Sequence, residues 1–284
     1  MGVSRGQVGG GMYKNVLLYQ GSKSRMVKHI IRLIPRDVDN FVELFCGSAV
    51  LSLHLSGVRI YLNDLDKKIY NFFRVLRDDS MRERFIKLCR LSPFDRATFD
   101  EAKAAIESDD PVYRAWGLAV RNMYSFGGLC KAWAAYPIGV EGRAVNFGGN
   151  LQNKCDYIES NHFKNFIKYA HVENKDALEV IRNLKNRPKR YKLFFYADPP
   201  YIGTDTGSYE GEYNIEDFIA LLEELASIKD HRWMLSCFKG DKVEYYKDKY
   251  GWQSKSVIER SGVKKSQVKE EMLYWNYDLE NRLL

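Results

Sequence analysis

The run LFFYA (193–197), followed by Asp198-Pro199-Pro200-Tyr201, carries the clearest indication of the fold in this sequence. Five consecutive apolar residues are typical of a buried strand, and the two prolines end it because proline lacks a backbone N–H and fixes φ at about −65°. A surface turn is the alternative interpretation, since Asp-Pro and Pro-Pro often mark loops. In open α/β sheets, however, ligands bind beyond the carboxyl ends of strands, which is where this tetrapeptide lies.

The tetrapeptide suits a planar group that carries an amine. The carboxylate of Asp198 and the carbonyl of Pro199 can accept its two N–H bonds, while the ring of Tyr201 stacks on its face. Pro200 keeps the turn stiff. The sequence therefore predicts a catalytic site formed by Asp198, Pro199, Pro200 and Tyr201, suited to an exocyclic amine of a nucleobase.

The composition is that of a globular protein of 284 residues, in one large domain or two smaller ones. Its 44 Lys and Arg exceed its 37 Asp and Glu, which favours a polyanionic partner. Its five dispersed cysteines form no CxxC pair, so we expect neither a disulfide framework nor a metal site. Residues 1–12 suggest a flexible glycine-rich tail, and no apolar run approaches the roughly 18 residues that span a bilayer, so a cytoplasmic protein is expected.

The apolar pattern predicts an α/β protein with a Rossmann-like, mostly parallel sheet and a C-terminal antiparallel hairpin. Near the N-terminus it predicts a β-turn-α-β unit, with strands at 41–45 and 59–63 and a helix at 49–55. Further strands are expected at 171–173, 193–197, 233–238, 253–260 and 272–278. Further helices are expected at 161–170, 177–184 and 215–228.

The segment 76–155 differs in character from the rest of the chain. Charged helical segments at 81–90 and 99–108 precede an aromatic, glycine-rich stretch at 127–149, which suggests a hairpin or a long loop. We therefore predict a mainly helical inserted domain with a β-hairpin, and a catalytic domain formed by residues 13–75 and 156–284.

The first strand-to-helix turn predicts a cofactor site. A small residue there lets the backbone approach a ligand closely, and the candidate residues are Glu43, Phe45, Gly47 and Ser48. Asp64, at the tip of the next strand, can accept hydrogen bonds from ribose hydroxyls. A helix N-cap is the equally weighted alternative for Asp64, and Asp66 is a competing candidate.

Neither a GxGxxG fingerprint nor a GxxxxGK[ST] phosphate loop occurs in this segment. The cofactor therefore needs a ribose acceptor and an aromatic contact but no phosphate cradle. S-adenosylmethionine fits that description better than a dinucleotide or ATP.

Four motifs, in this order, resemble those of the Dam-type, alpha-group (D12 class) adenine-N6 DNA methyltransferases: LYQGSK at 18–23, FVELFCGSA at 41–49, Asn63-Asp64, and the tetrapeptide at 198–201. GLCK at 128–131 resembles part of the recognition domain of that family. The resemblance implies a methyltransferase sheet with a target-recognition domain inserted at 76–155.

The resemblance also implies roles for single residues. Tyr19 and Lys23 belong to the N-terminal cofactor motif, and Lys23 is a partner for the methionine carboxylate. Asp176, after a short strand, reaches the cofactor's adenine amine. Glu43, Phe45, Gly47, Asp64 and Asp198 line the same site. Without the motif, Lys23 would be interpreted as a solvated lysine.

The implied activity is transfer of a methyl group from S-adenosylmethionine to N6 of an adenine flipped out of double-stranded DNA, leaving S-adenosylhomocysteine. GATC or a related short site is the implied target. A cognate restriction endonuclease is a candidate partner, and a monomer or weak dimer is expected. An inactive DNA-binding protein, or a methyltransferase acting on cytosine N4, RNA or a protein amide, are the alternatives; cytosine-N4 enzymes more often carry serine in place of Asp198.

A basic, aromatic segment of the insert suits DNA contacts. Its candidate residues are Arg121, Asn122, Tyr124, Phe126, Leu129 and Lys131. Packing on the insert's own core is the alternative for each ring. Three positions depart from the family pattern: Ala49 replaces a glycine, Gly127 an asparagine and Lys131 an arginine that reads guanine, so the target sequence stays open.

Overall fold

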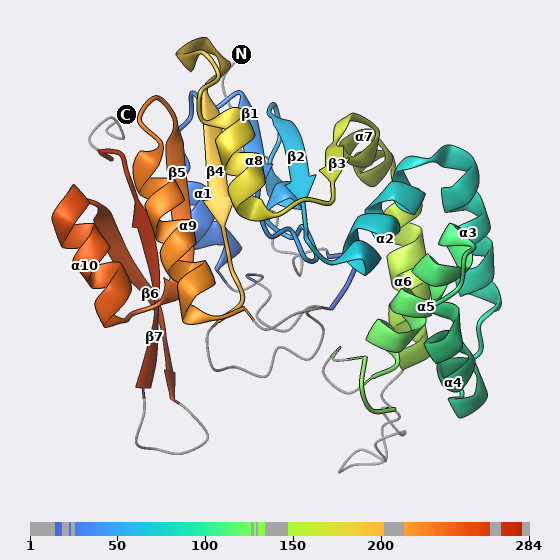
Figure 1. The fold of residues 1–284 in the computed structure, drawn as a ribbon. Helices are drawn as coiled ribbons and strands as arrows, with labels where there is room; N and C mark the ends of the chain where they lie inside the picture. Colours follow the sequence, from blue (N-terminus) through green and yellow to red (C-terminus); the bar gives the residue numbers. More distant parts are fainter. Residues whose placement is uncertain are drawn as a thin grey trace.

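A computed structural model describes residues 15–18, 23, 26–125, 128, 130–133, 147–201, 213–261 and 268–279. A seven-stranded sheet with the order β3-β2-β1-β4-β5-β7-β6 forms its centre (Figure 1). The strands are β1 (Asn40–Glu43), β2 (Arg59–Asn63), β3 (His171–Glu173), β4 (Leu193–Ala197), β5 (Arg232–Phe238), β6 (Gln253–Ser261) and β7 (Val268–Trp275).

The sheet is parallel from β3 to β5, and β7 runs antiparallel to both β5 and β6. The predicted fold class, a mostly parallel sheet closed by an antiparallel C-terminal hairpin, is confirmed. β1 and β4 are neighbours although β2 and β3 follow β1 in the chain, so the strand order reverses between them. In open α/β sheets the crevice beyond such a reversal is where ligands bind.

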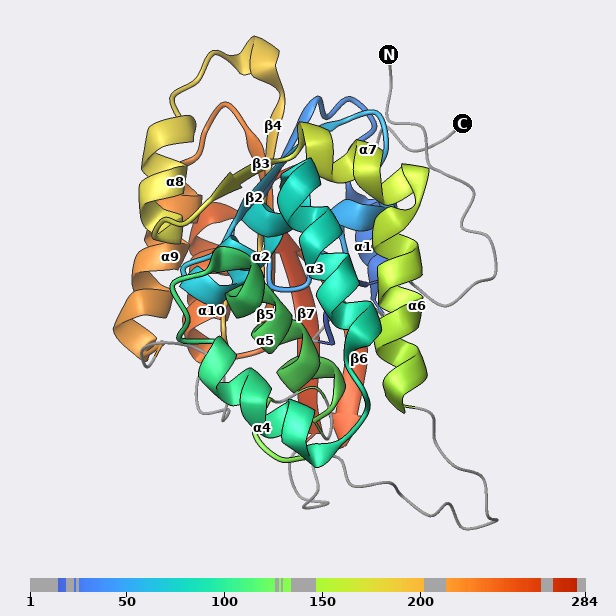
Figure 2. The same ribbon diagram turned by 90° about the vertical axis from the view of Figure 1, so that its right-hand side faces the viewer.

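Helices surround the sheet on three sides. In Figure 1, α8 (Ala177–Leu184), α9 (Ile215–Ser227) and α10 (Asp241–Tyr250) lie on the near face of the sheet and α1 (Val27–Leu33) lies behind it. The remaining helices gather beyond the edge strand β3, as Figure 2 shows from that side: α2 (Lys67–Arg77), α3 (Asp79–Leu91), α4 (Arg96–Ala105), α5 (Pro111–Met123), α6 (Phe147–Glu159) and α7 (Asn161–Tyr169). Across the described ranges, no helix has the length and apolar character to cross a membrane.

Most of these helices begin at a polar side chain that accepts a hydrogen bond from the first turn. Such caps satisfy backbone N–H groups that have no partner inside the helix. The capping residues are Asp66, Asp78, Asp95, Asp110, Ser160, Asp176 and Asn214. Short acidic and amide side chains therefore decide where the helices start.

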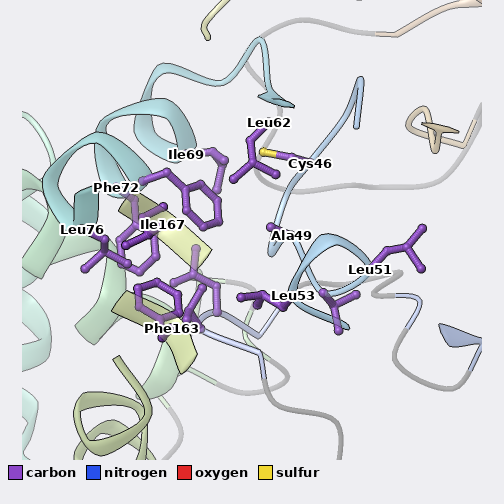
Figure 3. Packing of buried hydrophobic residues seen from close by; sticks show 14 of the residues in the cluster. Cys46, Ala49, Leu51, Leu53, Leu62, Ile69, Phe72, Leu76, Phe163 and Ile167 are labelled. Atoms are coloured by element: carbon purple, nitrogen blue, oxygen red, sulfur yellow. The ribbon is translucent and has the colours of Figure 1, made fainter. Parts of the chain in front are cut away.

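A continuous apolar core joins the first turn of the sheet to the helices beyond β3. Figure 3 shows Ala49 and Leu53, from the segment after β1, packed in one cluster with Phe72 of α2 and Phe163 of α7. Phe72 and Phe163 are fully buried, and Phe72 also meets Phe85 of α3 edge to face. Helices α2 to α7 are called the helical group below. This packing joins the loop after β1 to the helical group.

Several sequence predictions need correction. The helix predicted at 49–55 is only a short 3-10 turn at Ser52–His54, because Ala49 adopts a φ of 51°, outside the helical region, and Leu55 is extended. The hairpin or long loop predicted at 127–149 lies mostly outside the described residues, which show one antiparallel bridge between Ser125 and Trp133 and the start of α6 at Phe147. β7 begins four residues earlier than predicted and ends at Trp275. Helices α2, α5, α6 and α10 were not predicted.

Gly117 allows α5 to pack against α4 at close range. A Cβ there would lie 2.8 Å from the Ala102 carbonyl oxygen and 2.9 Å from the Ala105 Cβ. We expect Gly117→Ala to lower the free energy of unfolding by roughly 1–3 kcal/mol through overpacking, despite alanine's better helix propensity. Urea denaturation measures this. Gly240→Ala is the control because nothing lies within 4 Å of its Cβ position. If both variants lower the free energy of unfolding equally, the steric explanation is wrong.

Candidate active site

Three acidic side chains converge at the carboxyl ends of β1, β2 and β4. Glu43 is the last residue of β1, Asp64 directly follows β2, and Asp198 directly follows β4. Because β1 is paired in parallel with both β2 and β4, these ends meet at one edge of the sheet. The edge coincides with the reversal of strand order, so the predicted cofactor and catalytic residues lie together. In the described part of the chain, no group of three or more His, Cys, Asp or Glu side chains is arranged to hold a metal ion.

The turn after β1 is braced by Asp64. Its Oδ2 accepts from the Gly47 N–H at 2.8 Å and its Oδ1 from the Asp66 N–H at 3.0 Å. Gly47 has a φ of 46° and Ala49 a φ of 51°, so both occupy the left-handed region that glycine tolerates best. Ser48 between them is buried. Asp64 therefore supports the turn; Asp66 is instead the N-cap of α2.

Burial makes two of these carboxyl groups weak acids. Desolvation raises the pKa of Glu43 from 4.5 to about 8, despite a hydrogen bond that Ser52 donates to it, and the charges of Asp198 and Asp64 add to the rise. Desolvation likewise raises the pKa of Asp64 to about 7, against the lowering effect of the backbone N–H donors. Near neutral pH Glu43 is therefore mainly protonated, and a cation bound beside these two carboxyl groups would lower their pKa values and favour their ionised forms.

The raised pKa of Glu43 makes stability depend on pH. The unfolded chain loses this proton near its ordinary pKa of 4.5, while the native protein keeps it to about 8, so stability falls as pH rises across this window. A glutamine at this position would mimic the protonated form. We expect Glu43→Gln to match the wild type near pH 5 and to exceed it by at least about 2 kcal/mol at pH 9, measured by urea denaturation. An equal difference at both pH values would show that Glu43 is ionised throughout.

An aromatic edge flanks the turn on the side of α8. Phe45 meets Tyr213 edge to face at 6.2 Å between ring centroids. Asp176 is exposed and caps α8 by accepting from the Leu178 N–H at 2.8 Å. Burial, then the charges of Asp217 and Asp176, raise the pKa of Tyr213, so Asp176 lies near this edge. Tyr213 was not singled out from the sequence.

The tetrapeptide carries a polar cluster. Asp198 Oδ1 lies 2.6 Å from the Lys23 ammonium nitrogen, which also donates to the Tyr201 hydroxyl at 2.8 Å. Tyr201 in turn donates to Glu271 Oε1 at 2.6 Å. The sequence predicted Lys23 beside the cofactor; the structure places its ammonium on Asp198. Glu271, on β7, was missed, because an acidic residue in an antiparallel strand is normally expected to face solvent.

A cavity of about 350 Å³ adjoins the tetrapeptide, a size within the usual range of ligand pockets. Pro199, Pro200 and Tyr201 form one side, and Phe218 of α9 and Phe238 at the end of β5 contribute aromatic rings. The ring centroids of Tyr201 and Phe238 are 4.2 Å apart, and the two ring planes are tilted by 41°. The pocket is thus mainly apolar and partly lined by aromatic rings. From the sequence alone, Phe238 was not expected here.

The predicted DNA-contacting residues split into two groups. Arg121, Asn122 and Tyr124 are buried, and their polar groups are engaged within the protein. Arg121 lies 3.7 Å from the centre of the Phe99 ring and donates to the carbonyls of Cys130 and Lys131. This corrects the prediction of direct DNA contact for these three side chains, because burial removes them from the surface.

Asn122 joins the helical group to the N-terminal motif. It accepts from the Leu18 N–H at 2.7 Å and donates to the carbonyls of Leu18 at 2.6 Å and Gly128 at 2.9 Å. Tyr124 donates to the Ser92 carbonyl at 3.2 Å and packs against Phe94. Lys131 is exposed. Tyr19, Phe126, Gly127 and Leu129 lie outside the described residues.

Comparison with known proteins agrees with this geometry. The chain is 24% identical over 235 residues to the type II methyltransferase M1.LlaDCHI of Lactococcus lactis subsp. cremoris, covering 78% of this chain and 74% of that protein. It is 21% identical to the modification methylase StsI of Streptococcus sanguinis over 72% of this chain, and 25% identical to the type II methyltransferase M.FokI of Planomicrobium okeanokoites over 77%. The chain spans about a third of those two proteins, 31% and 34%. The profile of the D12 class N6 adenine-specific DNA methyltransferases matches residues 19–261, and the chain therefore belongs to that family.

Proposed function

We propose that this protein transfers a methyl group from S-adenosylmethionine to the exocyclic N6 of an adenine that is flipped out of double-stranded DNA, at GATC or a related short site. The observation that carries the proposal is the position of Asp198. It lies at the reversal of strand order, beside a mainly apolar pocket with aromatic lining, and its side chain keeps 20% exposure while Lys23 keeps 4%. Asp198 is thus the member of that pair that a substrate can reach.

The residues at the turn fit S-adenosylmethionine. Buried Glu43 and Asp64 favour a cationic ligand, Gly47 lets backbone approach it, and Phe45 with Tyr213 offers an aromatic edge. Asp176, near that edge, is the proposed partner of an adenine amine, and Asp64 of ribose hydroxyls. S-adenosylmethionine supplies the methyl group and leaves as S-adenosylhomocysteine.

The acceptor amine needs activation because its lone pair is delocalised into the adenine ring. We assign its two N–H groups to the Asp198 carboxylate and the Pro199 carbonyl, which together favour the tetrahedral nitrogen and expose its lone pair. Asp198 also takes up the proton that the nitrogen loses. The pocket beside Tyr201 and Phe238 would receive the flipped base and exclude water from it.

DNA binding is assigned to the helical group rather than to the three buried side chains. The net charge of +7 supports binding to a polyanion, and exposed Lys131 is the described candidate for a base or phosphate contact. Arg121 and Asn122 would act indirectly, by holding the segment that carries Lys131. A restriction endonuclease acting on the same site is a proposed partner, in line with the modification methylases among the relatives.

Methyl transfer from labelled S-adenosylmethionine to unmethylated genomic DNA, followed by nucleoside analysis and modification-aware sequencing, tests this function. We expect label in N6-methyladenine at one short sequence. Label in 4-methylcytosine would assign a different base, and label in RNA a different polymer. DNA binding without any transfer would instead support an inactive DNA-binding protein. A GATC duplex against one with a scrambled site tests the target sequence separately.

A further inference from the structure

Glu271 is a carboxyl group buried at the catalytic end of the sheet, with 0% exposure. β7 runs antiparallel to β5, which is parallel to β4, so β7 begins at the edge where β4 ends. Glu271 lies near the start of β7, paired with Phe238, and therefore reaches the tetrapeptide. A buried carboxylate is strongly unfavourable unless a cation and hydrogen bonds compensate it. Lys23 and Tyr201 provide both.

Lys23 lies between two carboxyl groups. Its ammonium nitrogen is 2.6 Å from Asp198 Oδ1 and 3.3 Å from Glu271 Oε1. Since the Lys23 side chain keeps only 4% exposure, water cannot replace an anion that leaves it. A substrate amine needs the same kind of contact with Asp198 that the Lys23 amine makes. If Asp198 turns to that amine and away from Lys23, the buried ammonium needs another anion close by.

We propose that Glu271 is a positioning residue, which becomes the main ionic partner of the Lys23 ammonium when Asp198 turns to the acceptor amine. This rests on the proposed function, in which Asp198 holds that amine. Lys23 then changes its closest partner without leaving the cluster. The Tyr201 hydroxyl, which accepts from Lys23 at 2.8 Å and donates to Glu271 at 2.6 Å, links the two groups during that change.

A simpler role for Glu271 would be to anchor the Tyr201 ring. The two roles differ in their dependence on Lys23. An anchor for Tyr201 matters equally with or without Lys23, whereas a counter-charge matters only while Lys23 is present. A mutant cycle that includes Lys23 therefore separates them.

Thermal unfolding tests whether Glu271 acts as a counter-charge for Lys23. The variants are Asp198→Asn, Glu271→Gln and their combination, and each is made with Lys23 intact and with Lys23→Met. With Lys23 intact, we expect the melting temperature of the combined variant to fall at least about 5 °C further than the sum of the single shifts, because the cation then loses Asp198 and Glu271 together. With Lys23→Met, this excess should vanish. Additive shifts, or the same excess without Lys23, would overturn the proposal.

Single-turnover methylation of DNA at saturating cofactor tests the catalytic consequence. Glu271→Gln should slow the step by roughly 10- to 100-fold, because Lys23 then competes with the acceptor amine for Asp198, and by less than about 3-fold in the Lys23→Met background. Glu270→Gln is the matched control. Glu270 precedes Glu271 on β7, pairs with Lys239 at 3.6 Å and is partly exposed, so we expect a change within about 2-fold.

The two measurements test two different proposals, so one proposal can be wrong while the other holds. If the wild type transfers no methyl group to DNA, the proposed function is wrong, while the melting temperatures still decide the role of Glu271. If the wild type is active and the melting shifts are additive, the proposal for Glu271 alone is wrong.

Discussion

Replacing Asp198 by alanine is expected to lower the rate of methyl transfer at least 1,000-fold, roughly the contribution of a positioned proton acceptor that also orients the nucleophile. The fold should persist because Lys23 keeps Glu271 as a partner at 3.3 Å. Cofactor affinity should change little, since Glu43, Asp64 and the turn after β1 are untouched. The single-turnover rate with labelled cofactor measures the loss, and calorimetry measures cofactor binding.

Asp248→Ala is the matched control for this variant. Asp248 lies on α10 with its side chain 76% exposed, so the same chemical change there should leave the rate within about 2-fold. If the control is unchanged and Asp198→Ala keeps a rate of methyl transfer within 10-fold of the wild type, Asp198 does not activate the acceptor amine.

The largest effect on stability is expected from Asn122→Ala. Asn122 is 4% exposed and makes hydrogen bonds with both backbone groups of Leu18 and with the Gly128 carbonyl. Removing the amide leaves these buried groups without their partner, which costs roughly 2–4 kcal/mol. Neighbouring packing cannot relax easily, because a Cβ at Gly128 would lie only 2.6 Å from the Leu18 Cβ. Urea denaturation measures the change.

Asn183→Ala makes the same substitution on the surface of α8. Asn183 is exposed and its one described hydrogen bond, to Glu179, is 3.4 Å long. We expect a change below about 0.5 kcal/mol, with any gain coming from alanine's helix propensity. If both asparagine variants behave alike, the hydrogen bonds between Asn122 and Leu18 contribute nothing measurable to the free energy of unfolding.

The strands near the site were predictable because each combines a local signal with a clear end. β2 and β4 occupy the residues predicted for them, since apolar runs there stop at polar or proline residues. The helix expected after Ala49 failed because a φ of 51° at Ala49 is set by the turn, and no periodicity reveals it. α5 was not predicted; ten of its 13 residues are buried, including the polar Arg121 and Asn122, so its polar residues do not mark a solvent-facing side.

Some features of the candidate site could likewise be predicted from the sequence, and others could not. Asp198 and Asp64 were predictable as neighbours because each directly follows a predicted strand, and parallel strands bring such ends together. Glu43 was expected inside a strand at 41–45, whereas β1 ends at Glu43. The roles expected of Arg121 and Asn122 depended on side-chain exposure, which sequence does not encode locally. Both are buried and hold other backbone segments in place. Whether a basic residue faces solvent or the interior is decided by packing between helices far apart in the chain.

The apolar strand that ends at Asp198 and two prolines could be predicted from the sequence, because each of these signals is local. The surroundings of that carboxylate could not, because they depend on contacts between distant parts of the chain. Lys23 and Glu271 are 248 positions apart in the chain, yet their charged groups lie 3.3 Å apart. Reversal of strand order and the antiparallel return of β7 bring them together. Burial then makes their charges depend on one another, because the interior offers no water to replace a lost partner.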